Sequence, residues 1–239
     1  MITGAAVCPS PPLLARELTG QAEVLPDLRT ACVGAVRRLL AAAPDLVVVV
    51  GAGPVIATWA PEDRLDLSAY APAQPERGKS GLPLALGLGA LLLEEAGYCG
   101  PRCLQAVGQA ASARECLRLG ASLAGLAPRV ALLAVGDGTA RRTATAPGHL
   151  DVRAAAFDES VLRALADGDM AALAGLEENL ARELMATGRA AWQVLAGAMT
   201  GADVPGKHTS APAAEILYAD APFGVGYLVA VLTAECLPG

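Results

Sequence analysis

The chain has 239 residues, of which 54% are hydrophobic, and its formal net charge is −6. This charge argues against nucleic acid as the main partner, because neutralising phosphates requires clustered Lys and Arg. The longest uncharged apolar stretch, residues 81–93, falls short of the roughly 20 residues that a membrane span needs, so we expect no membrane partner.

Predicted strands and helices alternate through the first half of the chain. Apolar runs predict buried strands at residues 2–7, 46–50, 103–107 and 130–135. Helical spacing of apolar side chains predicts helices between them, at residues 25–43, 81–96 and 111–126. The second of these helices is expected to pack closely through Gly87 and Gly89, and the segment before it, residues 61–81, is predicted to be a loop. This alternation is typical of a three-layer α/β/α domain with a central mixed, mostly parallel sheet.

The second half of the chain is predicted to be mostly helical. Glycine-containing breaks divide a long helical pattern into three predicted helices, at residues 152–166, 170–186 and 189–199. A loop rich in Gly and Pro follows, and then two apolar segments, residues 215–219 and 225–234, are expected to form an antiparallel pair that completes the sheet. No linker divides the chain, so we predict one domain over residues 1–239.

Three short segments that follow predicted strands are rich in small or hydroxyl-bearing residues. They are residues 7–14, 50–54 and 136–141. Ligands bind to open α/β sheets where the chain leaves the carboxyl ends of strands, so these segments are expected to line one small-molecule pocket. Asp137 is the single carboxylate among them. Imidazole is absent from all three, and the chain has two histidines in all, His149 and His208, which we expect to be exposed in loops.

Two of these segments also have simpler explanations. Gly51 and Gly53 have the spacing that begins a dinucleotide fingerprint, but Ile56 stands where the third glycine belongs and the strand is not the first of the chain. Asp137 could cap the backbone amides of its own turn and contact no ligand. Both alternatives stay open at this point.

Four motifs stand in order along the chain. They are Pro9-x-Pro11-Pro12-Leu13-Leu14, Gly51-x-Gly53-Pro54, Gly136-Asp137 before a basic loop, and Ala221-Pro222-Phe223-Gly224-Val225-Gly226-Tyr227. This order, which covers residues 2–235, resembles the class III extradiol dioxygenase superfamily, to which the LigB-type catalytic subunits and the MEMO-type proteins belong. The resemblance implies a LigB-like α/β fold. In the iron-dependent members it also implies an Fe(II) held by two His and one Glu, with a further His as acid/base.

The resemblance also implies that the metal site has been lost. The two metal-binding His positions fall on Ser10 and Ala52, and the acid/base His falls on Ala140. The carboxylate ligand falls on Asp220. A methyl group binds no metal and a neutral hydroxyl is a poor ligand for Fe(II), so we expect no cofactor, neither iron nor zinc.

The leading hypothesis is a diverged, non-catalytic member of this superfamily that keeps a small-molecule pocket and acts in binding, as a partner subunit or as a homo-oligomer. The residues expected to line the pocket are Ser10, Gly51, Ala52, Gly53, Asp137, Thr139, Ala140, Arg141 and Asp220. One alternative is an enzyme of altered chemistry, hydrolysis or transfer on a small acid, in which Arg141 or Arg142 clamps an anion. Another is a ring-cleavage dioxygenase whose metal site has been rebuilt with His149 or His208.

The six cysteines are spread along the chain without the spacing of a disulfide framework or a zinc site. The first basic residue of the chain is Arg16, so we expect no secretory signal with a charged start. We therefore expect a reduced, cytoplasmic protein.

Overall fold

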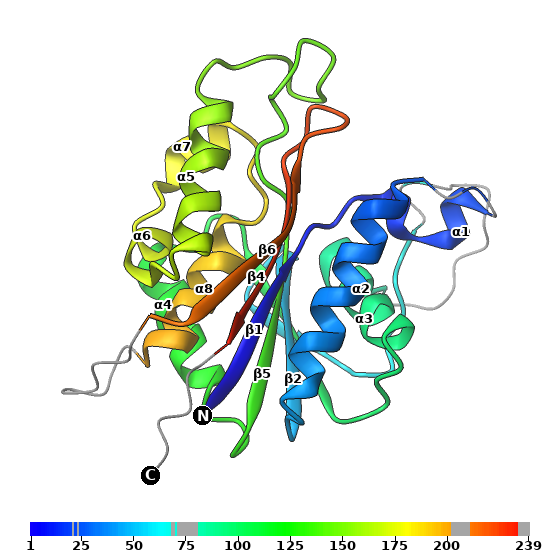
Figure 1. The fold of residues 1–239 in the computed structure, drawn as a ribbon, viewed down its shortest axis with the longest axis vertical. Helices are drawn as coiled ribbons and strands as arrows, with labels where there is room; N and C mark the ends of the chain where they lie inside the picture. Colours follow the sequence, from blue (N-terminus) through cyan, green and yellow to red (C-terminus); the bar gives the residue numbers. More distant parts are fainter. Residues whose placement is uncertain (21, 23, 68–69, 71–80, 202–210, 234–239) are drawn as a thin grey trace.

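The protein is described by a computed structural model in which residues 1–20, 22, 24–67, 70, 81–201 and 211–233 are placed. Within these residues, seven strands form one sheet in the order β3-β4-β2-β5-β1-β7-β6. Their bounds are β1 Ile2–Cys8, β2 Leu46–Gly53, β3 Ala57–Trp59, β4 Arg102–Gly108, β5 Val130–Val135, β6 Ala213–Asp220 and β7 Tyr227–Thr233. Helices cover both faces of this sheet, which makes a three-layer α/β/α fold (Figure 1).

The centre of the sheet is parallel and its two edges are antiparallel. Strands β4, β2, β5 and β1 run in the same direction, whereas β3 is antiparallel to β4. On the other side, β7 is antiparallel to both β1 and β6, which confirms the predicted pair at the end of the chain. The predicted mixed, mostly parallel sheet is therefore confirmed.

Each face of the sheet buries its own hydrophobic cluster, because successive strand residues point to opposite faces. In β1, Ala5 and Val7 belong to one cluster, whereas Ala6 and Cys8 belong to the other. The helices that contribute to the Ala6–Cys8 side are α2 (Pro26–Ala41) and α3 (Leu84–Glu95). The opposite side is formed with α4 (Ala113–Leu123), α5 (Ala154–Ala166), α6 (Met170–Ala174), α7 (Glu178–Glu183) and α8 (Arg189–Thr200).

Glycines bring several of these layers unusually close together. A Cβ added at Gly89 of α3 would lie 2.5 Å from Cγ1 of Val49 in β2, and one at Gly87 would lie 2.4 Å from Cδ1 of Leu65. The predicted close packing of this helix is thus confirmed. Helices α4 and α8 are also in close contact, because a Cβ at Gly120 would lie 2.0 Å from the backbone oxygen of Val194.

The structure differs from the sequence-based prediction in several of its short elements. Residues 170–186 form two helices rather than one, since the side chain of Glu177 accepts hydrogen bonds from the backbone N–H groups of Asn179 and Leu180 and so begins α7 afresh. The short strand β3 was not predicted, because its three residues show no clear alternation. Most of the predicted 61–81 loop, and residues 202–210 of the next long loop, lie outside the described residues. Among the described residues, no helix combines the length and hydrophobicity needed to cross a membrane.

Candidate functional site

The order of the strands brings two predicted pocket residues into contact. Strands β1 and β5 are parallel neighbours, so the residues that leave their carboxyl ends lie side by side. Ser10 is buried there, and its backbone N–H donates a 2.6 Å hydrogen bond to Oδ1 of Asp137. The backbone N–H of Gly136 continues the ladder to the carbonyl of Cys8 at 2.9 Å. These contacts form the centre of the candidate site.

The backbone of Asp137 is held from the side opposite Ser10. Its N–H donates to Oγ1 of Thr187 at 3.0 Å, and its carbonyl accepts from the N–H of Gly188 at 2.8 Å. Gly136 permits this approach, because a Cβ there would lie 2.5 Å from the Cα of Gly188. The carboxylate of Asp137 is therefore held by Ser10 after β1, and its backbone is held by the segment that precedes α8.

The carboxyl of Asp137 has an unusually high pKa. Burial raises its pKa from the ordinary value of 3.8 to about 6, although hydrogen bonds from Ser10 act in the opposite direction. Tyr227, at the start of β7, is buried nearby, and its pKa is raised by burial and by the charge of Asp137. A carboxyl that titrates near pH 6 lies in the range in which general acids and bases operate.

The loop that follows β5 pairs with the turn between β6 and β7, and the two rise together at the upper end of the sheet (Figure 1). The N–H of Gly138 donates to the carbonyl of Gly226 at 2.7 Å, and the N–H of Gly226 donates to the carbonyl of Thr139 at 2.8 Å. Further along, the N–H of Arg142 donates to the carbonyl of Gly224 at 3.0 Å. The motif Gly136-Asp137 and the late glycine-rich motif therefore form one structural unit.

Asp158 of α5 binds this unit through its carboxylate. Asp158 was not identified from the sequence as a residue of the site. Its carboxylate accepts hydrogen bonds from the N–H of Thr139 at 2.8 Å, from Oγ1 of Thr139 at 2.9 Å and from Nη1 of Arg142 at 3.0 Å. A Cβ at Gly226 would lie 2.4 Å from Oδ2 of Asp158. The signal that could have revealed this role is a carboxylate between Phe157 and Val161, on the apolar face of a predicted helix.

The segment Gly51-Ala52-Gly53 does not follow a strand, as predicted, but forms the last three residues of β2. A Cβ at Gly51 would lie 2.6 Å from Cβ of Ala85 at the start of α3, and one at Gly53 would lie 2.6 Å from Cβ of Ala106 in β4. Gly51 therefore allows close packing against α3, and Gly53 allows a close approach to Ala106. By strand alternation, Ala52 faces the opposite side of the sheet from Gly51 and Gly53.

Three further residues predicted for the pocket differ in their exposure and contacts. Ala140 is buried, and its backbone bonds to the carbonyl of Leu184 at 3.1 Å and to the N–H of Gly148 at 2.9 Å. Arg141 has a buried Nε atom that makes no hydrogen bond within the described residues. Asp220 is exposed at the end of the edge strand β6, where its Oδ1 accepts from the N–H of Ala221 at 2.7 Å.

His149 belongs to no metal ligand set within the described residues. His149 is exposed in the loop after β5, and its Nδ1 lies 3.3 Å from the carbonyl of Ala144. His208 lies outside the described residues. Among the residues that the structure describes, no group of three or more His, Cys, Asp or Glu is arranged to hold a metal ion.

Comparison with known proteins supports the fold and nothing finer. No family model matches the chain, and no curated protein matches it. A solved structure described as "Crystal structure of uncharacterized protein JW3007 from Escherichia coli K12" is similar, with a TM-score of 0.54 and 15% sequence identity. The match covers 97% of this chain and 99% of that chain. The two proteins therefore share their fold along nearly the whole length.

Proposed function

We propose that this protein is a diverged, non-catalytic member of the class III extradiol dioxygenase-like superfamily that binds a small molecule without a metal. The site would lie at the carboxyl ends of β1 and β5. The observation that supports it best is the 2.6 Å hydrogen bond between the backbone of Ser10 and the carboxylate of Asp137, which joins two of the predicted pocket segments. The absence of imidazole at Ser10, Ala52 and Ala140 supports binding without ring cleavage.

The chemistry of the site favours a ligand that donates hydrogen bonds. The carboxylate of Asp137 accepts from Ser10 at one oxygen, which leaves acceptor capacity for a hydroxyl or amine group. Arg142 is already paired with Asp158, whereas the buried Nε of Arg141 makes no hydrogen bond within the described residues. Beside the carboxylate of Asp137 itself, a neutral, hydroxyl-bearing compound suits the site better than an anionic one.

Catechol is a suitable first probe for this proposal. Titration of the labelled protein should shift the backbone amide resonances of Ser10, Asp137 and Thr187 in a saturable manner. The variant Asp137→Ala should weaken binding by about tenfold or more, since it removes a charged hydrogen-bond acceptor. Asp45→Ala is a matched control, because Asp45 accepts a hydrogen bond from the N–H of Arg129 before β5 begins, at the opposite end of the sheet. This ligand class is excluded for the site if the native protein shows no saturable resonance shift. It is also excluded if Asp137→Ala and Asp45→Ala bind catechol with equal affinity.

A second candidate function is acid/base chemistry, which the pKa of about 6 at Asp137 favours. In this case an activated ester of a small acid should be hydrolysed with a rate that changes around pH 6. The variant Asp137→Asn should remove that inflection while the protein stays folded. Activity that is unaltered in Asp137→Asn would rule out this role for the carboxyl.

A further inference from the structure

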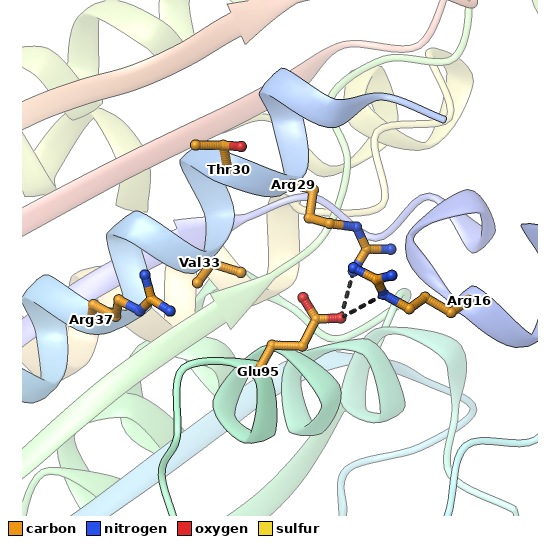
Figure 2. A pocket seen from close by; sticks show the side chains of 6 residues that line it. All are labelled: Arg16, Arg29, Thr30, Val33, Arg37 and Glu95. Carbon is orange, nitrogen blue, oxygen red and sulfur yellow. Dashed lines mark hydrogen bonds and ion pairs between the residues drawn. The ribbon is translucent and has the colours of Figure 1, made fainter. Parts of the chain in front are cut away.

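A groove beside α2 is lined by three arginines and lies apart from the candidate site described above. It has a volume of about 380 Å³. The residues that line it are Arg16, Arg29, Thr30, Val33, Arg37 and Glu95 (Figure 2). This volume is at the lower end of the range of small-molecule sites, about 300–1,000 Å³.

Three helices contribute the lining side chains. Arg29, Val33 and Arg37 follow one another at intervals of four residues, so they form a single stripe along α2. Arg16 comes from the short helix α1 (Arg16–Thr19), and Glu95 is the last residue of α3. Figure 2 shows the carboxylate of Glu95 pointing toward the guanidinium groups of Arg16 and Arg29.

The charges of the groove are only partly neutralised. Oε1 of Glu95 lies 2.5 Å from Nη1 of Arg29 and 3.9 Å from Nε of Arg16. Arg29 is held further by a 2.5 Å hydrogen bond from its Nη2 to the carbonyl of Leu14. Within the described part of the chain, Arg37 forms no ion pair. Three guanidinium groups and one carboxylate leave a local charge of about +2 in a chain whose net charge is −6.

We propose that this groove binds the phosphate group of a small soluble molecule. A phosphate dianion matches the local charge, and guanidinium groups present the paired N–H donors that phosphate oxygens accept. Arg29 is already fixed by Glu95 and Leu14, so binding orders only the exposed side chains of Arg16 and Arg37. Val33 offers an apolar contact to the organic part of the molecule.

The proposal is tested by calorimetric titration of the whole chain with phenyl phosphate and with inorganic phosphate at low ionic strength. Arg37→Gln and Arg16→Gln should each weaken binding of both probes by about tenfold, because each removes a charged donor. Arg38→Gln is the matched control, since Arg38 is the next residue of α2 and is paired with Glu215 at 2.5 Å. That variant changes the net charge equally and should leave the affinity unchanged.

Two further variants distinguish a specific binding site from nonspecific electrostatic attraction of anions. Glu95→Gln should strengthen binding, because it removes the carboxylate that competes for Arg16 and Arg29. Val33→Ala should weaken binding of phenyl phosphate but not of inorganic phosphate. The proposal is overturned if neither probe binds, or if Arg38→Gln weakens binding as much as Arg37→Gln. Asp137→Ala should have no effect, so the result does not depend on the function proposed for the other site.

Discussion

The backbone N–H of Ser10 and the carboxylate of Asp137 form a 2.6 Å hydrogen bond across 127 residues of sequence. The bond exists because β1 and β5 are adjacent and parallel, although β2, β3 and β4 lie between them along the chain. It places a largely but not completely buried carboxyl beside the N–H donor of Ser10. The proton affinity of Asp137 is therefore the most direct reporter of this site.

We expect the stability of the protein to depend on the titration of Asp137. Its pKa is raised to about 6 in the folded protein, so folding favours the protonated form. Stability from this group is fully present below about pH 4 and is lost as pH rises through about 6, with a total change of about 1–2 kcal/mol after allowance for its partial exposure. Urea unfolding of the native protein and of Asp137→Asn between pH 4 and pH 7.5 measures this difference.

The variant Asp137→Asn keeps an oxygen that can accept the hydrogen bond from Ser10. It should therefore match the native protein at pH 4 and exceed it in stability at pH 7.5. Asp45→Asn controls for the loss of an ordinary carboxylate. A constant difference between native protein and Asp137→Asn at all pH values would contradict the raised pKa.

The fold followed from the sequence because buried strands carry a strong local signal. The segment Val130–Val135 is apolar at every position, and the structure buries every one of its residues. The ends of strands were harder to predict where the residues are common in both strands and loops. Gly51 and Gly53 look like loop residues, yet they continue β2 by pairing with β4, where a Cβ would lie 2.6 Å from Ala85 of α3 at Gly51 and 2.6 Å from Ala106 of β4 at Gly53.

The details of the candidate site could be predicted only in part. Asp137 stands directly after a predicted strand, which is a local signal, and the neighbouring position of Ser10 follows from parallel pairing. Asp158 could not be connected to Thr139 from sequence, because that contact depends on how α5 packs beneath the loop. The environment of Tyr227 likewise depends on the order of strands in the sheet.

We expect Asp158 to be important for stability rather than for binding directly. Asp158→Ala leaves the N–H and hydroxyl of Thr139 and the guanidinium of Arg142 without their acceptor, and should destabilise the protein by about 3 kcal/mol. Glu159→Ala is the control, because within the described residues Glu159 forms only an exposed ion pair with Arg163. This substitution should cost less than about 0.5 kcal/mol. Denaturant unfolding at pH 7 measures the free energy of unfolding of the two variants. Equal losses in both would exclude a stabilising role of the Asp158 hydrogen bonds.

We also predict that the purified protein binds neither iron nor zinc stoichiometrically and does not cleave catechol. The reason is chemical, since Ser10, Ala52 and Ala140 supply no imidazole. Elemental analysis and oxygen uptake after addition of Fe(II) and catechol provide the measurement. One equivalent of iron together with oxygen uptake would favour a rebuilt metal site instead, and loss of both in His149→Ala or His208→Ala would identify its ligand.

The last prediction concerns the contact between α4 and α8. Replacing glycine by alanine within a helix ordinarily stabilises it by about 1 kcal/mol, because alanine loses less backbone entropy. At Gly120 the new Cβ would lie 2.0 Å from the backbone oxygen of Val194, so the helices must separate and lose buried contacts. We expect Gly120→Ala to destabilise the protein by about 2–3 kcal/mol.

Gly34 of α2 provides the matched control, because a Cβ there meets nothing within 4 Å. Gly34→Ala should stabilise the protein by about 0.5–1 kcal/mol, with opposite sign to Gly120→Ala. Thermal and urea unfolding of both variants test the pair. If both substitutions stabilise the protein, then α4 and α8 lie farther apart than the structure places them. The position of Gly188, which precedes α8 and contacts Asp137, would then need revision as well.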